Sequence, residues 1–223
     1  MESLIKDAIV EHLAANSLIR SSQHGFTAGR SCLTNLLEYM EELTSLVEMG
    51  HSVDMFYLDF SKSFDLVPHR RLLVKLQGLG IQGKVARWVE EWLSDRKQRV
   101  VLNGEVSDWG DILSGVVQGS VLGPTLFLCF INDLDLAVDM TMAAGGEKRC
   151  SIIKKFADDT KWVMQVMGEE DRASFQQGID SLHRWSEKWQ MPFNEDKFHV
   201  LHIGRTIAKH QYTMGGIQLE EVK

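Results

Sequence analysis

An adjacent pair of aspartates, Asp158 and Asp159, is the stretch of this chain whose residue types best suit chemistry. The β-favouring runs 152–156 and 160–164 flank the pair, and this pattern predicts two short strands joined at an acidic tip. Aspartate is common in turns because its side chain bonds its own backbone, so the pair by itself could be an ordinary turn. A second acidic strand end elsewhere in the chain favours a functional interpretation.

That second position is Asp59, at the carboxyl end of the apolar run 52–60. An unpaired charge there would be costly, so a structural salt bridge is the alternative interpretation. Two-metal sites hold their ions roughly 4 Å apart and need carboxylates that converge from rigid elements. Mg²⁺ takes oxygen ligands and keeps only one or two protein carboxylates besides phosphates. A strand-end aspartate beside a carboxylate pair on a hairpin therefore predicts a two-metal polymerase centre.

Apolar periodicity and turn residues predict the elements that position these side chains. The Asn-Gly dipeptide at 103–104 predicts a hairpin between 96 and 109, and residues 139–149 carry the glycines of an exposed loop. Trp88 and Trp92 are predicted to be core residues. Helices are expected over 4–13, 33–47, 68–80, 85–93 and 169–189, with another through 126–131 after a loop at 115–120, and a last strand from 198.

Composition limits the class of protein. The 223 residues are 44% hydrophobic and contain no apolar run of membrane-spanning length. Three widely separated cysteines argue against a disulfide framework or a zinc site and indicate a reducing, intracellular location, cytoplasmic or nuclear. The net charge of −7 is unfavourable for phosphate binding. We expect a fragment that lacks the basic parts of a nucleic-acid-binding protein.

Five segments resemble the reverse transcriptases of LINE-type (non-LTR) retrotransposons, in the same order. The resemblance implies an α+β fold: a polymerase palm, with an antiparallel sheet packed on helices, partial fingers and a truncated thumb. It implies partial fingers over 1–50, the palm with interleaved fingers elements over 51–204, and the start of the palm–thumb connection over 205–223. The segments are QHGFTAGRSCLTNLL, YLDFSKSFDLVPH, SGVVQGSVLGPTLFLCFINDL, KFADDTKW and WQMPFNEDKFHVLHIG.

The resemblance also implies catalytic roles. Asp59 and Asp158 would be the main ligands of two Mg²⁺ (or Mn²⁺) ions, and Asp159 would support the metal and the primer end. Lys197 matches the family lysine thought to protonate leaving pyrophosphate, and a positioned ammonium can do so chemically. A surface lysine is the alternative. The implied reaction is RNA-templated transfer of deoxynucleotides from their triphosphates to a DNA primer 3′-hydroxyl.

Five further residues match substrate-binding positions of the family. Phe60 would contribute its backbone to binding the metal or the triphosphate. Phe64 matches the bulky aromatic that rejects a ribose 2′-hydroxyl, and simple packing beside Phe60 is its alternative interpretation. Gln118 and Gly119 match the loop that contacts nucleotide and template, where glycine allows close backbone approach. Arg30 matches a position that could touch template or nucleotide, although exposed loop arginines are common.

Departures from the family pattern bear on activity. Val117 stands where members usually have proline, which presets the loop backbone, Ser63 replaces alanine, and Thr27 replaces a basic residue. With upstream finger strands absent, weak or no polymerase activity is expected from this chain alone.

An inactive or co-opted binding or scaffold protein is therefore an alternative. An RNA-dependent RNA polymerase palm, with Asp65 reading the 2′-hydroxyl, is a weaker one.

Overall fold

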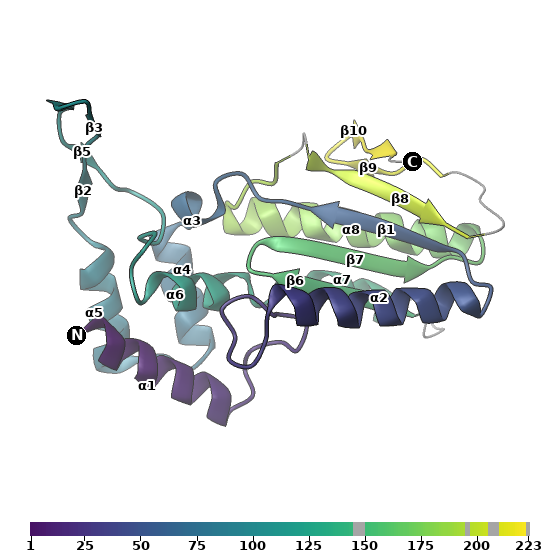
Figure 1. Cartoon of the computed structure of the whole chain (residues 1–223), viewed down its shortest axis with the longest axis horizontal. Coiled ribbons are helices and arrows are strands. Elements are labelled where there is room, and N and C mark those ends of the chain that lie inside the picture. The colour runs from purple at the N-terminus through teal and green to yellow at the C-terminus, as the bar shows by residue number, and fades with distance from the viewer. Residues whose placement is uncertain (145–149, 195–196, 205–209, 222–223) are drawn as a thin grey trace. The chain divides into compact units, whose positions relative to one another are not determined.

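A computed structural model describes residues 1–144, 150–194, 197–204 and 210–221, which Figure 1 shows as a ribbon. The chain divides into two compact units that interleave along the sequence. The first unit consists of residues 1–19 and 62–130, and the second consists of residues 20–61 and 131–223. The domain boundaries expected at residues 50 and 204 stay a prediction.

A five-stranded sheet is the centre of the second unit, with strand order β11-β8-β1-β7-β6. Its pairs are antiparallel except for the parallel edge pair β11–β8. The predicted acidic hairpin is present as β6 and β7, and the predicted strand that ends before Asp59 is β1 at the centre. The strands are β1 (Val53–Leu58), β6 (Ser151–Phe156), β7 (Asp159–Gln165), β8 (His199–Ile203) and β11 (Glu220–Glu221).

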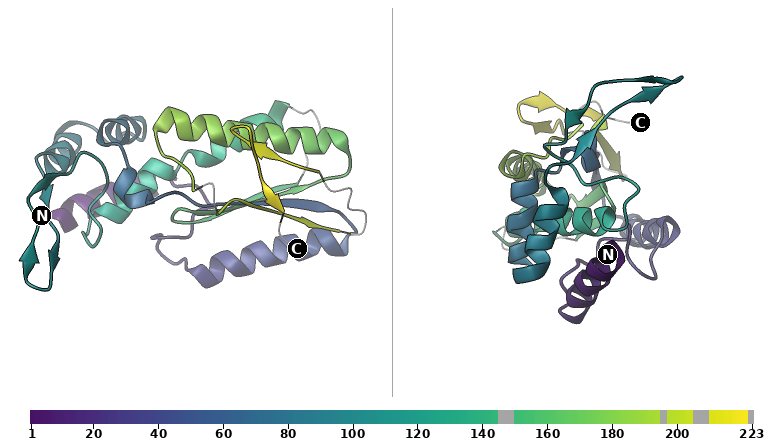
Figure 2. Two further views of the ribbon diagram at one scale, coloured as in Figure 1. Left: turned by 90° about the horizontal axis from the view of Figure 1, so that it is seen from above. Right: turned by 90° about the vertical axis from the view of Figure 1, so that its left-hand side faces the viewer.

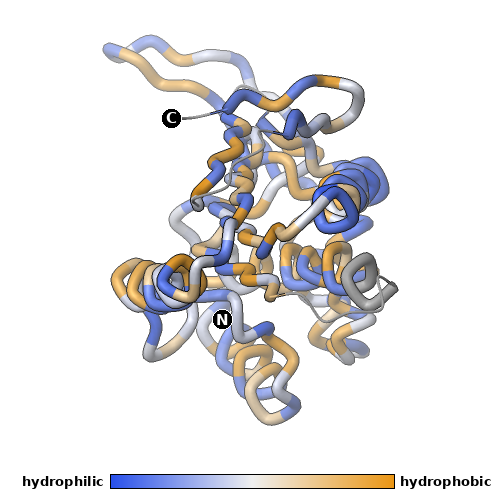
Figure 3. The backbone as a smooth tube through the Cα atoms, turned by 90° about the vertical axis from the view of Figure 1, so that its right-hand side faces the viewer, coloured by the Kyte–Doolittle hydropathy of each residue, from blue (hydrophilic) through white to orange (hydrophobic). Residues whose placement is uncertain are grey.

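Helices cover both faces of this sheet, as the view from above shows (Figure 2). On one face, α2 (Cys32–Glu48) packs Tyr39, Leu43 and Leu46 against strand residues that include Met55 and Val163. On the other face lie α7 (Leu134–Ala144) and α8 (Glu169–Trp189). Hydrophobic and hydrophilic residues intermingle along the helices, as expected for amphipathic elements (Figure 3).

The first unit is mainly helical, and its helices follow the predicted periodicity. A two-tiered hairpin projects from α5, with the Asn-Gly turn at its tip, where both residues have positive φ. Trp88 and Trp92 stack at a ring separation of 6.4 Å but are only half-buried, so they are less buried than predicted. The elements are α1 (Glu2–Ala15), α3 (Ser63–Leu66), α4 (His69–Gly78), α5 (Gly83–Leu93), β2 (Lys97–Gln98), β3 (Val101–Leu102), β4 (Glu105–Val106), β5 (Gly110–Asp111) and α6 (Gly123–Ile131).

The loop predicted over 139–149 is wrong in its first half, because α7 continues to Ala144. Residues 139–144 contain no glycine or proline and include two methionines and two alanines, which favour a helix over a loop. The remaining residues of that predicted loop, 145–149, lie outside the described ranges. Near the C-terminus, β9 (Thr213–Met214) and β10 (Ile217–Gln218) form a short hairpin that the sequence reasoning did not predict. No helix within the described residues is long and apolar enough to cross a membrane.

Candidate active site

Strand register brings the two predicted acidic strand ends together in the second unit. β1 and β7 pair antiparallel as far as Leu58 opposite Thr160. One further residue in the same register puts Asp59 opposite Asp159, the first residue of β7. Directly opposite residues of an antiparallel pair point to the same face. By the alternation along each strand, that face is the one that α2 covers.

The hairpin tip that carries Asp158 is unusually tight. Phe156 pairs with Asp159, which leaves Ala157 and Asp158 as a two-residue loop. Ala157 has a φ of 55°, in the left-handed region that side chains other than glycine rarely adopt. Such a positive φ at the first loop residue matches hairpin turns that usually have glycine there. The sequence predicts the turn but not this strain.

Lys197 lies beside the acidic group. Its Nζ is 2.8 Å from Oδ2 of Asp59, whose side chain is 19% exposed. This bond and the Asp59 charge raise the pKa of Lys197, so the ammonium stays protonated. The chain next to Lys197 is attached to the end of β1, because the N–H of Asn194 donates to the carbonyl of Asp59 and the N–H of Lys197 donates to the carbonyl of Asn194. The structure therefore brings Asp59 and Lys197 into direct contact, and the structural salt bridge considered for Asp59 is present.

The neighbouring carboxylates repel one another. The pKa of Asp159 is raised above its ordinary value, first by partial burial and then by the charges of Asp158 and Asp59. Lys161 and Lys197 oppose this shift. Mutual repulsion of this kind is relieved by a cation placed among the carboxylates.

Carboxylates are the ligand type that Mg²⁺ prefers, so the donor chemistry fits a divalent cation. Within the described ranges, however, no group of three His, Cys, Asp or Glu side chains is already arranged to hold a metal ion. Lys197 is the cation that contacts Asp59 instead. A metal ion at Asp59 would compete with the Lys197 ammonium for Oδ2 of this carboxylate.

Two predicted substrate residues of the second unit make contacts within the protein. The Phe60 ring is buried and stacks on Phe193 at a centroid distance of 4.6 Å, and the substrate contact expected of its backbone stays a prediction. The Arg30 guanidinium folds back to donate to the carbonyls of Ser21 and Gln23 in its own loop. Arg30 therefore braces the loop that lies against the acidic hairpin.

The other predicted substrate residues belong to the first unit. Phe64 stacks on Phe127 at a centroid distance of 4.4 Å and its ring is half-buried, whereas the alternative interpretation placed it beside Phe60, so its role stays a prediction. The Gln118 amide donates to Asp65 across 2.8 Å. Gly119 has a φ of 80° and no atom within 4 Å of the position where a Cβ would stand, so its backbone is accessible for close approach.

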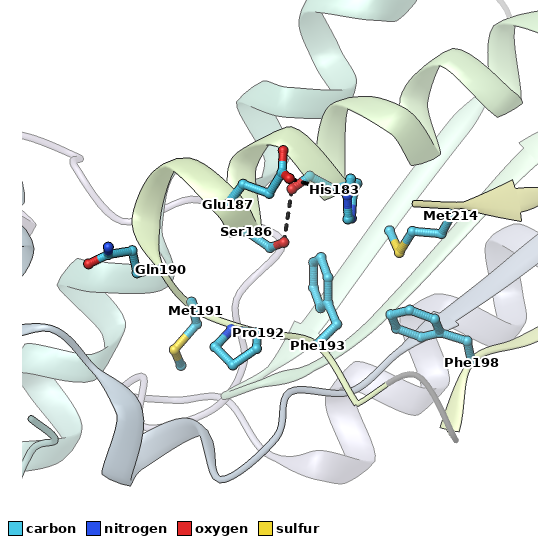
Figure 4. A pocket seen from close by; sticks show the side chains of 9 residues that line it. All are labelled: His183, Ser186, Glu187, Gln190, Met191, Pro192, Phe193, Phe198 and Met214. Carbon is cyan, nitrogen blue, oxygen red and sulfur yellow. Dashed lines mark hydrogen bonds and ion pairs between the residues drawn. The ribbon is translucent and has the colours of Figure 1, made fainter. Parts of the chain in front are cut away.

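A cavity of about 380 Å³ lies at the C-terminal end of α8 (Figure 4). Phe193 and Phe198 contribute aromatic rings to it, and Ser186 donates to the carbonyl of His183 at its rim. None of the predicted site residues that the structure describes lines this cavity. Its largely apolar walls do not suit a charged nucleotide, so the carboxylate group remains the candidate site.

Comparisons with known proteins bear on this carboxylate group. The family model described as reverse transcriptase (RNA-dependent DNA polymerase) matches residues 1–219. The chain belongs to the reverse transcriptase family. The chain is 27% identical, over 198 residues, to the RNA-directed DNA polymerase from mobile element jockey of Drosophila melanogaster, and 25% identical to the probable RNA-directed DNA polymerase from transposon X-element of the same species. The resemblance to LINE-type enzymes is thereby confirmed.

Each of these comparisons covers 88% of this chain but 21% of the relative, so the chain spans about a fifth of their length. Among solved structures, apo telomerase from Candida tropicalis truncated from its C-terminal domain is similar with a TM-score of 0.68 and 14% identity, over 98% of this reverse transcriptase chain and 43% of that one. Telomerase from Candida albicans in complex with a fragment of telomeric RNA has a TM-score of 0.64 at 11% identity, over 97% and 37%. The predicted α+β palm fold is confirmed.

One buried residue at this site was missing from the sequence prediction. Gln23 contacts both backbone polar groups of Ala157, next to Asp158. The only available signal was its place in the QHGFTAGR segment of the family resemblance, and neither periodicity nor charge distinguishes it from a loop glutamine.

Proposed function

We propose that this chain is the catalytic core of an RNA-directed DNA polymerase that extends a DNA primer along an RNA template. The observation that supports the proposal best is the strand register that aligns Asp59 with Asp159 at one end of the central sheet. Backbone hydrogen bonds hold the two strand ends together. The carboxylates that these ends carry can therefore keep the fixed separation that two-metal chemistry demands. On this proposal, residues 1–50 belong to the fingers, 51–204 chiefly to the palm, and 205–223 begin the connection to the thumb.

Asp59 and Asp158 would hold two Mg²⁺ or Mn²⁺ ions, with Asp159 supporting one of them. Bound ions of this kind activate a primer hydroxyl and neutralise charge on the triphosphate. Asp59 would release Lys197 when it takes up a metal. The freed ammonium could then donate a proton to departing pyrophosphate, which a lysine locked in an ion pair does poorly.

The remaining residues would select the substrate. The Phe60 backbone would contact the triphosphate, and Phe64 would exclude ribonucleotides by occupying the space of a 2′-hydroxyl. Gln118 and Gly119 would contact nucleotide and template, and the Gln118 amide would have to leave Asp65 to do so. Arg30 would act at the edge of the template path while bracing its loop.

Primer extension on an RNA template with deoxynucleoside triphosphates and Mn²⁺ or Mg²⁺ tests the proposal. Asp158→Asn should lower the extension rate at least about 100-fold, because one metal ligand loses its charge. Asp108→Asn, at an exposed position of the first unit, is the matched control and should leave the rate unchanged. Equal rates in the two variants would refute the assignment of the carboxylates.

A scaffold function without catalysis is the second candidate, favoured by the Lys197–Asp59 ion pair and by Val117 in the loop. Thermal melting during Mn²⁺ titration distinguishes the two. A rise in melting temperature that Asp158→Asn abolishes supports the polymerase, and no rise supports the scaffold.

Comparing deoxy- with ribonucleotide incorporation, with and without Phe64→Ala, tests the RNA polymerase alternative.

A further inference from the structure

We infer that Gln23 is a positioning residue for the catalytic carboxylates: its side-chain amide fixes the backbone of Ala157 and thereby aims Asp158 and Asp159. The inference rests on the proposed function, because it assigns Gln23 a role at that same site. It adds an uncharged residue from the polar loop that precedes α2, and this residue acts on the carboxylates through the backbone of Ala157.

This amide makes three hydrogen bonds, two to the hairpin tip and one within its own loop. Oε1 of Gln23 accepts from the N–H of Ala157 at 2.9 Å and from the N–H of Gly25 at 2.8 Å. Nε2 donates to the carbonyl of Ala157 at 3.1 Å. Gln23 is 2% exposed, so each of these groups would be left unsatisfied in the interior if the amide were removed. Both polar backbone groups of a single residue are therefore held by one side chain.

The tip needs such a restraint because Ala157 is in an unfavourable backbone conformation. Its left-handed φ costs an alanine about 1–2 kcal/mol. Two hydrogen bonds to Gln23, each contributing a net of about 0.5–1.5 kcal/mol, are large enough to offset that cost. Without them, Ala157 would relax toward a negative φ. Rotation at Ala157 turns the next peptide unit, which carries Asp158.

Gln23 is itself held in place by backbone pairing, so it can transmit this restraint. The N–H of Lys155 donates to the carbonyl of Ser22, and the N–H of His24 donates to the carbonyl of Lys155, both at 2.8 Å. These bonds place the loop as a short parallel bridge along β6, the edge strand of the sheet. Arg30 adds a bond to the Gln23 carbonyl at 3.2 Å.

The test is a Mn²⁺ titration of purified chain, followed by thermal melting, together with backbone hydrogen exchange at the hairpin tip. Gln23→Ala should weaken Mn²⁺ binding about 10-fold, as loss of an outer-shell partner typically does. It should also speed amide exchange at Ala157. Gln23→Met keeps the length of the side chain and loses both polar groups, so it should weaken binding to a similar degree while leaving a smaller cavity. It also serves as the second variant if the alanine variant does not fold.

Asn35→Ala is the matched control. Asn35 is also a buried amide, and it donates to the same strand at the carbonyl of Lys155 across 3.1 Å. Its loss should lower stability to a similar degree while Mn²⁺ affinity stays within about twofold. Equal Mn²⁺ affinity in wild type, Gln23→Ala and Gln23→Met would overturn the inference alone. A wild-type chain that does not respond to Mn²⁺ would overturn the proposed function and the inference with it.

Discussion

Gly25 offers the sharpest perturbation of the acidic hairpin, because its backbone lies directly against the tip. A Cβ added at Gly25 would be 2.3 Å from the backbone nitrogen of Ala157 and 3.0 Å from its Cα. Ordinary contact begins at 3.4 Å, so Gly25→Ala forces the tip and the loop apart by about 1.1 Å. Gly25 does not have a left-handed φ, so the effect is one of space alone.

The expected size follows from two contributions. Overpacking against a backbone atom costs about 1–3 kcal/mol. Weakening the bonds that Gln23 makes to Gly25 and Ala157 adds about 1 kcal/mol. We therefore expect Gly25→Ala to lose about 2–4 kcal/mol of unfolding free energy. A displacement near 1 Å at a catalytic group also costs about 100-fold in rate, so primer extension should fall by that factor.

Urea denaturation measures the stability change, and Mn²⁺ titration with primer extension measures the change at the site. Gly29→Ala is the control in the same loop: its φ of 75° imposes strain of about 1–2 kcal/mol, but no atom lies within 4 Å of the added Cβ. Mn²⁺ affinity should then stay unchanged. If Gly25→Ala matched Gly29→Ala in both metal affinity and rate, close packing of this loop against the tip would be refuted.

Two further predictions concern buried charges near the hairpin. Lys155 is fully buried and pairs with Asp135 at 2.5 Å. In urea denaturation, Asp135→Asn should lower the free energy of unfolding by about 3–5 kcal/mol, whereas replacing both residues by Met and Leu should lower it by less than about 1 kcal/mol. An Asp135→Asn variant as stable as wild type would contradict this prediction. Burial lowers the pKa of His24 below 6.5, against the opposing Glu38 charge. The unfolded chain therefore binds more protons than the folded chain once the pH drops below 6.5. The free energy of unfolding should then fall by up to about 1.4 kcal/mol per pH unit until the lowered pKa is reached. His24→Gln should remove that slope, and parallel melting profiles between pH 7 and 5 would disprove the assignment.

The sequence predicts the acidic hairpin and β1 well because alternating β-favouring residues and turn residues act locally. It does not predict which strands become neighbours, since β1 and β7 are about a hundred positions apart in the chain. That these two strand ends converge was inferred only from what a two-metal site requires. Local patterns also did not predict the end of α7, where glycines after Ala144 suggested a loop too early.

Lys155 and Gln23 show why the remainder of the site was not predictable. A lysine or glutamine is normally exposed, yet Lys155 is 0% and Gln23 2% exposed. Both are buried because distant residues provide partners: Asp135 for the ammonium, and the backbone of Ala157 for the amide. Burial of this kind depends on tertiary contacts, and no periodicity in the sequence encodes it.

On the proposed function, the balance of charge at the site would let an acidic chain serve a polyanionic substrate. The Lys161 ammonium lies over the Tyr39 ring. Without it, the three carboxylates and the contacting ammonium of Lys197 have a formal charge of −2, which one divalent cation neutralises. A second cation would leave the group positively charged unless its charge were balanced by the phosphates of an incoming nucleotide. The proposed site is therefore suited to hold one ion at rest and to reach full occupancy only with substrate. In a Mn²⁺ titration, the proposal requires a tight first site and a second site that strengthens when a nucleoside triphosphate is added.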